Sequence, residues 1–242
     1  MTRSSRAPLA RLVVFGLLIF AVVAWSQDRP PICEQIAKAY GLDSFKQVEQ
    51  IRYTWNLDAG ALKVSRSWVW EPKTDRVSYD GPDKAGKPVK VTYLRSQIAS
   101  QPAAVKEEVD PAFINDQYWL LFPLHLSWDT SAKVEDKGKA KLPTGKGTAT
   151  RVVVTYPSAG GYTPGDSYEL FVGADNHIQE WIFHRGGSAK PTLIASWADY
   201  KKAGPLVISL DHRGTYQGKP ARIFLSNVSV KLVGSNTWTD AQ

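Results

Sequence analysis

The sequence predicts a mainly β protein in which an antiparallel sheet curls into an incomplete barrel, accompanied by a few helices. Segments in which apolar and polar residues alternate recur along the chain, which is the pattern of strands with one buried face. Short turn-rich segments separate most of them and favour hairpins with antiparallel pairing. Because roughly ten or eleven such strands in a flat sheet would expose edges and apolar surface, we expect the sheet to curl around an apolar interior.

A short helix and a meander of four strands begin the domain. Ile32, Ile36 and Tyr40 recur at helical spacing, and Gly41 suits a left-handed helix stop. The alternation then predicts strands over residues 50–57, 61–71, 76–79 and 89–93. Their short connections predict antiparallel neighbours.

A helical insert over about residues 100–123 interrupts the strands. Asp110 suits the position before a helix, and Pro111 suits its first residue. The expected helix covers 111–122, and Pro123 should end it and return the chain to an extended conformation over 124–128. Because the second half of this helix is apolar nearly all round, we interpret the insert as a plug or lid on the concave side of the sheet.

Six further strands are expected over residues 149–156, 168–172, 178–185, 191–200, 206–210 and 223–232. Residues 133–146 mix lysines with glycines and acidic groups and predict a solvated loop, with weak attraction to anionic lipid head groups as the alternative. No Pro-rich or Ser/Gly-rich linker divides residues 27–242, which should therefore form one domain.

The N-terminus has the layout of a secretory signal peptide. Arg3, Arg6 and Arg11 precede an uncharged run of 14 residues over 12–25, shorter than the roughly 20 residues of a membrane-spanning helix. Ala24 and Ser26 are the small residues that signal peptidase favours, which predicts a signal peptide over 1–26. The mature chain should be periplasmic or secreted, and a permanent membrane anchor is the less favoured alternative.

Composition argues against several classes of function. The formal net charge of +7 falls to +4 without the three signal-peptide arginines, which is too small to indicate a nucleic-acid groove. Cys33 is the only cysteine, so no intramolecular disulfide can form, and Ile32 before it does not fit a lipobox. The four histidines lack metal-site spacing, and we interpret Asp211-His212 and Asp175-Asn176-His177 as turn or strand-end residues. No G-x-S-x-G motif occurs, which argues against a serine hydrolase, and we assign no catalytic residue, metal or cofactor from the sequence.

The order of these features resembles that of the LolA/LolB-like proteins of the bacterial envelope, which include lipoprotein carriers and sorting proteins. The shared features are the signal peptide, the opening helix, strands rich in Trp and Tyr, and a helical insert after the first strands. Two segments, NDQYWLLFPLHLSWD (115–129) and GGYTPGDSYELFV (160–172), look like those of uncharacterised exported members. The resemblance implies a half-barrel closed by helices over a hydrophobic cavity for acyl chains or other apolar groups.

The resemblance also suggests ligand-binding residues. The candidates for the cavity wall are Trp55, Trp68, Trp70, Trp119 and Trp181, together with Tyr118 and Phe122 of the apolar helix. Arg52 and Arg66 are the two candidates for the early-strand arginine that, in the carriers, helps to hold the lid closed. This chain departs from the carriers in its larger insert and its lack of a clear lipobox.

Three functions remain open at this stage. The first is a non-catalytic, monomeric periplasmic protein that holds an acyl chain, lipid or lipidated partner and contacts the membrane only transiently. The second is a cofactor-free enzyme on the same barrel, with Arg52, Arg66 or His184 in the pocket. The third is a structural module for envelope assembly, in which the tryptophans only fill the core.

Overall fold

The computed structural model describes residues 29–242, and the predicted signal peptide over 1–26 lies outside them. Strands make up 49% of the residues and helices 23%, so the chain is mainly β, as predicted. The helices are α1 (Pro31–Ala39) and α2 (Asp110–Trp128), with short helical turns at Leu42–Gln47, Arg95–Ser100, Val105–Val109 and Arg185–Gly187. The strands are β1 (Val48–Ala59), β2 (Leu62–Glu71), β3 (Arg76–Pro82), β4 (Pro88–Leu94), β5 (Lys133–Lys141), β6 (Thr148–Thr155), β7 (Ser167–Val172), β8 (Ile178–His184), β9 (Leu193–Ser196), β10 (Ala198–Ala203), β11 (Leu206–Tyr216), β12 (Lys219–Leu232) and β13 (Trp238–Asp240).

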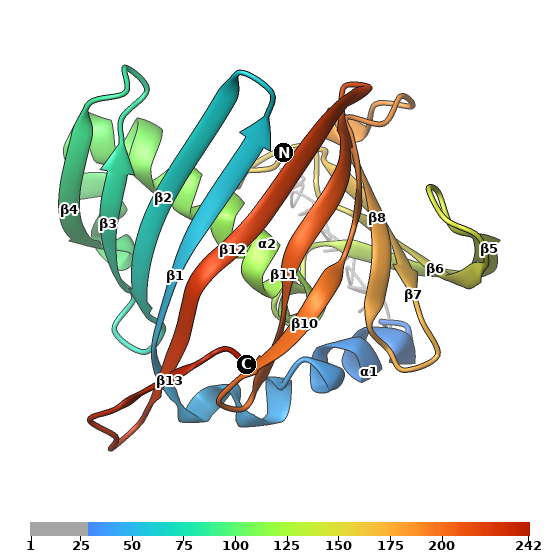
Figure 1. The fold of residues 1–242 in the computed structure, drawn as a ribbon, viewed down its shortest axis with the longest axis horizontal. Helices are drawn as coiled ribbons and strands as arrows, with labels where there is room; N and C mark the ends of the chain where they lie inside the picture. The colour runs from blue at the N-terminus through green and yellow to red at the C-terminus, as the bar shows by residue number, and fades with distance from the viewer. Residues whose placement is uncertain (1–28) are drawn as a thin grey trace, which may run out of the picture.

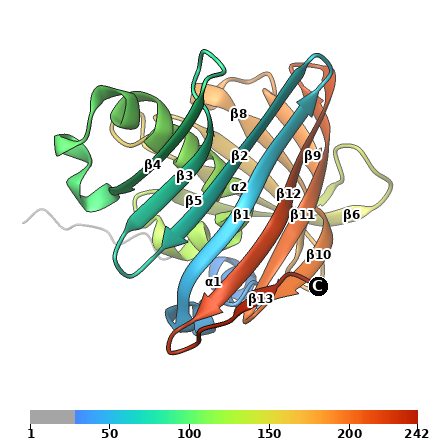
Figure 2. The same cartoon turned by 60° about the vertical axis from the view of Figure 1, so that its left-hand side comes forward.

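All thirteen strands belong to one antiparallel sheet. Its order is β4-β3-β2-β1-β12-β11-β9-β8-β7-β6-β5, while β10 pairs with β11 and β13 pairs with β12. The first and last long strands, β1 and β12, therefore lie side by side in the middle of the sheet (Figure 1). The sheet bends strongly along its width but does not close into a barrel, and β4 and β5 are its two ends (Figure 2).

Alternation along the strands separates a buried inner face from a polar outer face. On β1 the side chains of Ile51, Tyr53 and Trp55 are buried on the inner face. Arg52 and Thr54, which alternate with them, belong to the outer face. The β1–β2 register places Trp70 opposite Ile51 and Trp68 opposite Tyr53. Period-two patterning thus directs the aromatic residues of neighbouring strands to the same side of the sheet.

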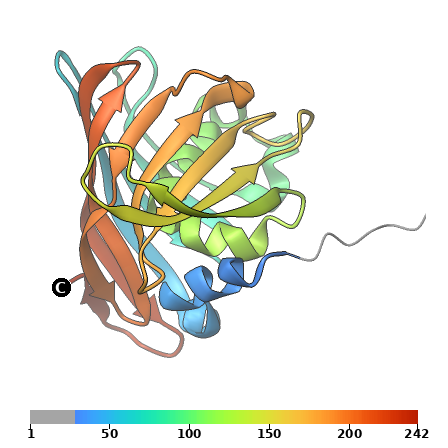
Figure 3. The same cartoon turned by 90° about the vertical axis from the view of Figure 1, so that its right-hand side faces the viewer.

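Helix α2 lies inside the curve of the sheet, as the sequence predicts for an insert that is apolar nearly all round (Figure 3). Phe113 packs its ring 5.4 Å from that of Trp68, centroid to centroid. One turn and a half further on, Trp119 lies 4.5 Å from Trp181 of β8. The helix therefore contacts both arms of the curved sheet, and α1 packs beside it at the end of the sheet shown lowest in Figure 1.

The beginning of α2 differs from the prediction. Helical structure already starts at residue 103, and Asp110 lies inside it with a buried side chain instead of capping its start. The turn Val105–Val109 before Pro111 is a π-helix, whose wider hydrogen-bonding pattern accommodates a residue that has no N–H to donate. The prediction of an N-cap at Asp110 is therefore wrong.

The end of α2 also differs from the prediction. Pro123 does not end the helix, which continues to Trp128 after a kink at Leu121. The kink two residues before the proline places Pro123 near the start of a second helical segment, where its ring and missing donor are tolerated. Arg29 then hydrogen-bonds the carbonyls of Leu126, Asp129 and Ala132 at the C-terminal end of the helix.

The strands differ from the prediction at three places. The expected loop over 133–146 begins as β5, an edge strand whose exposed lysines suit an unpaired sheet edge. The expected strand over 191–200 is two strands, β9 and β10, which meet at Trp197. The short strand β13 was not expected, because three residues carry too little pattern to recognise.

Candidate functional site

A cavity of about 640 Å³ lies between α2 and the inner face of the sheet. This volume is within the range of pockets that bind small molecules. Its wall combines β1, β2, α2, the loop before β7, β8, β9, β11 and β12, so it exists only because the sheet curls around the helix. The lining residues are Trp55, Leu57, Ala59, Leu62, Pro111, Ile114, Asn115, Tyr118, Trp119, Tyr162, Thr163, Pro164, Asp166, Tyr168, Trp181, Phe183, Arg185, Gly186, Leu193, Tyr216, Ala221 and Ile223.

Aromatic rings form one side of this cavity. Trp181 lies 4.5 Å from Trp119 and 5.2 Å from Tyr168, and Tyr168 stacks on Phe183 at 5.0 Å. Rings at these separations attract one another and are held firmly in place. The cavity wall is therefore a rigid apolar surface, suited to the burial of hydrocarbon.

The structure separates the predicted aromatic residues into two groups. Trp55, Tyr118, Trp119 and Trp181 line the cavity. Trp68, Trp70 and Phe122 are buried but do not line it, because the first two pack on Phe113 and the third packs behind Tyr168 and Trp181. The second group belongs to the protein core.

The two predicted arginines lie on opposite faces of the sheet. Arg66 on β2 reaches the fully buried Asp116 of α2, with Nε 2.7 Å from Oδ2 and Nη2 2.5 Å from Oδ1. Its guanidinium also lies 4.2 Å from the centre of the Trp55 ring, at the cavity wall. Arg66, not Arg52, therefore joins the sheet to the helical insert.

Asp116 is held by more than one donor. Trp68 Nε1 donates to its Oδ2 at 2.8 Å, and Asn115 Nδ2 donates to its Oδ1 at 3.0 Å. Burial raises the pKa of the Asp116 carboxyl above its usual value, while the hydrogen bonds from Arg66, Asn115 and Trp68 oppose that rise. The bidentate contact with Arg66 is the strongest kind of ion pair and fixes the orientation of the helix.

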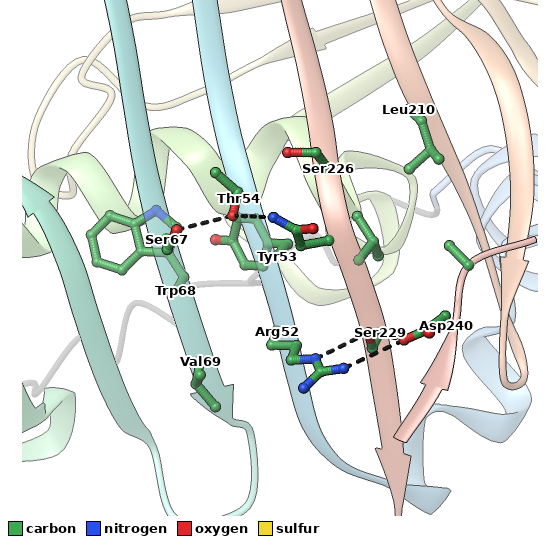
Figure 4. A pocket seen from close by; sticks show the side chains of 13 residues that line it. Arg52, Tyr53, Thr54, Ser67, Trp68, Val69, Leu210, Ser226, Ser229 and Asp240 are labelled. Carbon is green, nitrogen blue, oxygen red and sulfur yellow. Dashed lines mark hydrogen bonds and ion pairs between the residues drawn. The ribbon is translucent and has the colours of Figure 1, made fainter. Parts of the chain in front are cut away.

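Arg52 lies on the outer face of the sheet, in a shallow polar groove of about 660 Å³ (Figure 4). Its Nε donates to Ser229 Oγ at 3.1 Å, and its guanidinium pairs with Asp240 at 3.4 Å. Thr54 and Ser67 hydrogen-bond to each other at 2.9 Å in the same groove. These polar groups are paired with one another, and polar and apolar groups share the wall of the groove, whereas the wall of the inner cavity is mostly apolar.

A second polar cluster lies at the far end of α2. His125 Nδ1 is 3.0 Å from Asp129 Oδ1, its Nε2 is 2.8 Å from Gln117 Oε1, and Tyr118 and Tyr156 donate to Asp129 Oδ2 at 2.8 and 2.7 Å. Burial raises the pKa of both tyrosines, and their hydrogen bonds with that of His125 hold the pKa of Asp129 low. The tyrosines are therefore protonated donors to a carboxylate, an arrangement that positions Tyr118 at the cavity.

The mouth of the cavity is more polar than its interior. The loop before β7 contributes Tyr162 and Asp166, and the turn after β8 contributes Arg185. Asp166 Oδ1 accepts the backbone N–H of Gly186 at 2.6 Å, which ties the loop to the turn. Tyr162 donates to Asp110, so the same loop is also attached to α2.

The sequence did not reveal two residues, one beside the cavity and one at its mouth. His212 was interpreted as a turn or strand-end residue, but it lies within β11 with 1% of its surface exposed. Arg185 at the mouth gave no signal because a single arginine beside glycines is typical of any turn. Among residues 29–242, no group of three His, Cys, Asp or Glu side chains could hold a metal ion.

None of the helices within residues 29–242 is both long and apolar enough to cross a membrane.

No protein-family model matches this sequence, and no curated protein matches it. Several solved structures do. A DUF1329 family protein from Desulfovibrio piger is 9% identical with a TM-score of 0.47, over 85% of this chain and 93% of that one. A putative outer membrane lipoprotein-sorting protein domain from Vibrio parahaemolyticus is 10% identical with a TM-score of 0.46, over 85% of this chain and 92% of that one. The lipoprotein LppX of Mycobacterium tuberculosis is 8% identical with a TM-score of 0.28, over 81% and 94%.

Proposed function

We propose that this protein binds an apolar ligand, such as an acyl chain, a lipid or a lipidated partner, in the cavity between α2 and the sheet. The observation that carries the proposal is a space of about 640 Å³ walled by Trp55, Trp119, Tyr168 and Trp181. A core that only needed filling would be packed to crystal-like density, with few voids larger than a water molecule.

Burial of hydrocarbon alone supplies enough free energy for such binding. Each methylene moved from water into an apolar site contributes about 0.8 kcal/mol, so a chain of about ten methylenes gives about 8 kcal/mol before ordering costs. A micromolar dissociation constant corresponds to about 8 kcal/mol of net free energy, so after ordering costs a chain of about ten methylenes should bind more weakly than micromolar and longer chains more tightly. No catalytic group is required for this function.

The polar contacts of α2 support the proposal by keeping the cavity open. Arg66 and Asp116 join β2 to the helix, and Tyr162 joins the mouth loop to Asp110. Because buried charged groups are stable only when paired, the helix is held at a fixed distance from the sheet and does not collapse onto the aromatic wall.

The proposal is tested by binding to delipidated protein. The mature chain is refolded from denaturant, titrated with fatty acids of increasing length, and followed by the fluorescence of its tryptophans. We expect saturable binding that strengthens with each added methylene. Mass spectrometry of organic extracts from natively purified protein should find a bound apolar molecule. Absence of saturable binding for every chain length, together with an empty extract, would refute the proposal.

Two variants distinguish the cavity from the outer groove. Ala221 lines the inner cavity, and Ala241 lines the groove on the outer face. Ala221→Phe should weaken fatty-acid binding at least tenfold, because its ring occupies ligand volume. Ala241→Phe, which adds the same ring on the other side, should leave binding unchanged.

We also propose that the mature protein is exported to the periplasm. The charged start, the apolar run over 12–25 and the small residues Ala24 and Ser26 support this. N-terminal sequencing of the protein from a periplasmic fraction should begin at Gln27. Recovery of uncleaved protein from the cytoplasm would contradict export.

A further inference from the structure

A histidine in unusual surroundings lies beside the cavity, in the wall of a small neighbouring void. His212 projects from β11 opposite Ile223 of β12, and 1% of its surface is exposed. Its ring centre lies 5.1 Å from that of Trp119 on α2 and 4.7 Å from that of Trp197, at the junction of β9 and β10. The imidazole therefore lies against two indoles, and the ring of Trp181 packs against both of them.

Neither nitrogen of this imidazole makes a hydrogen bond of good geometry within residues 29–242, although the backbone of Ser196 and Ser209 approaches the ring closely enough to oppose the fall in its pKa. The indole N–H groups of Trp181 and Trp197 are buried without a partner as well. Burial lowers the pKa of His212 to about 4, so at neutral pH the ring is uncharged and offers one donor and one acceptor. Most buried polar groups in folded proteins are hydrogen-bonded, and a cluster that is not points to a missing partner.

A small void next to His212 has room for that partner. It measures about 10 Å³, close to the space that one water-sized group needs. Trp119, Leu193, Ala221 and Ile223 line both this void and the main cavity, so the two spaces adjoin. A molecule in the main cavity can thus place one polar atom beside the histidine.

We propose that His212 is the polar anchor of the ligand site and hydrogen-bonds an uncharged oxygen group, such as a hydroxyl or an ester carbonyl, carried by an otherwise apolar ligand. This inference rests on the proposed function and narrows its ligand class. A carboxylate is a poor partner, because a neutral imidazole among indoles offers no positive charge to compensate for its burial. A plain hydrocarbon leaves the donor and acceptor of His212 unpaired.

The test compares two ligands that differ only in the polar group. Decane and 1-decanol are titrated against delipidated protein by displacement of a fluorescent apolar reporter. The measured quantity is the ratio of their dissociation constants in the wild type, in His212→Phe and in His212→Gln. The phenyl ring replaces imidazole at similar volume without hydrogen bonding, whereas the glutamine side chain keeps a donor and an acceptor.

We expect the preference for decanol over decane to fall about tenfold in His212→Phe, while decane binding remains. His212→Gln should retain part of the preference. In the wild type, decanol but not decane should shift the ¹⁵N resonances of the His212 ring, a change that a purely structural histidine would not show.

Two results would overturn the proposal. An equal decanol-to-decane ratio in the wild type and His212→Phe would show that the histidine does not recognise the hydroxyl. Ring resonances that stay fixed at saturating decanol would show that a trapped water, not the ligand, fills the void. If neither decane nor decanol displaces the reporter from the wild type, the proposed ligand-binding function is wrong. If both displace it equally well in the wild type and in His212→Phe, only the proposed role of His212 is wrong.

Discussion

Removal of either partner of the Arg66–Asp116 pair should strongly destabilise the fold. Asp116 has no exposed surface and Arg66 is mostly covered, so each single substitution leaves a charged or polar group without its main partner. Breaking a buried ion pair from one side reduces the free energy of unfolding by about 3–5 kcal/mol. For a chain of this size, that corresponds to a decrease in Tm of roughly 10 °C.

Urea unfolding monitored by tryptophan fluorescence measures this effect for Arg66→Met, Asp116→Leu and the double variant. Because the double variant has no unpaired charge, it should recover at least half of the stability that Arg66→Met loses. The control is Asp80→Asn, which breaks the exposed pair between Asp80 and Lys90 and should change stability by less than about 1 kcal/mol. Additive losses in the double variant would show that the two residues do not act as a pair.

Three further substitutions test separate parts of the fold. Between pH 6.5 and 4, His212 is protonated in the unfolded chain but stays neutral in the folded protein, because burial lowers its pKa to about 4. The free energy of unfolding of the wild type should therefore fall by up to about 3 kcal/mol over this range. Urea unfolding at each pH should show a smaller fall in His212→Phe. Gly214→Ala places a Cβ 1.8 Å from the Ile194 carbonyl oxygen, so it should lower the free energy of unfolding by more than about 2 kcal/mol in the same assay. An unchanged urea midpoint would contradict the close approach of β9 and β11. Arg29→Ala removes the hydrogen bonds at the end of α2, so it should speed amide hydrogen exchange over 125–132 and lower the free energy of unfolding by about 1–2 kcal/mol. Unchanged exchange would show that these hydrogen bonds do not stabilise the helix end.

The strands that the sequence revealed are those with one buried face. On β1, apolar Ile51, Tyr53 and Trp55 alternate with polar residues, and this pattern specifies both the strand and the side that faces the core. The sequence of β5 has no such pattern, because most of its side chains are exposed. Its identity as a strand comes from backbone pairing with β6, which side-chain hydrophobicity does not report.

The candidate site was only partly predictable for a similar reason. Aromatic positions such as Trp119 and Trp181 were identifiable because large apolar side chains belong inside, but the sequence could not show which of them border empty space. His212 was missed because its neighbours, Asp211 and Arg213, are charged and look like a turn. Backbone pairing with β12 extends β11 over this polar segment, and the alternation of side chains along the strand places His212 on the inner face.

The carboxylates of Asp110 and Asp116 in α2, and of Asp129 directly after it, indicate how a ligand reaches the cavity. Asp110, Asp116 and Asp129 each bind a different part of the molecule: β4 with the mouth loop, β2, and the end of β6. Displacement of the whole helix would break all three contacts at once and leave three carboxylates without their hydrogen-bond partners. The mouth loop is attached to its surroundings by far fewer bonds, and Tyr162 at its tip is already 44% exposed. We therefore expect a ligand to enter past Tyr162 and Arg185 while α2 stays in place.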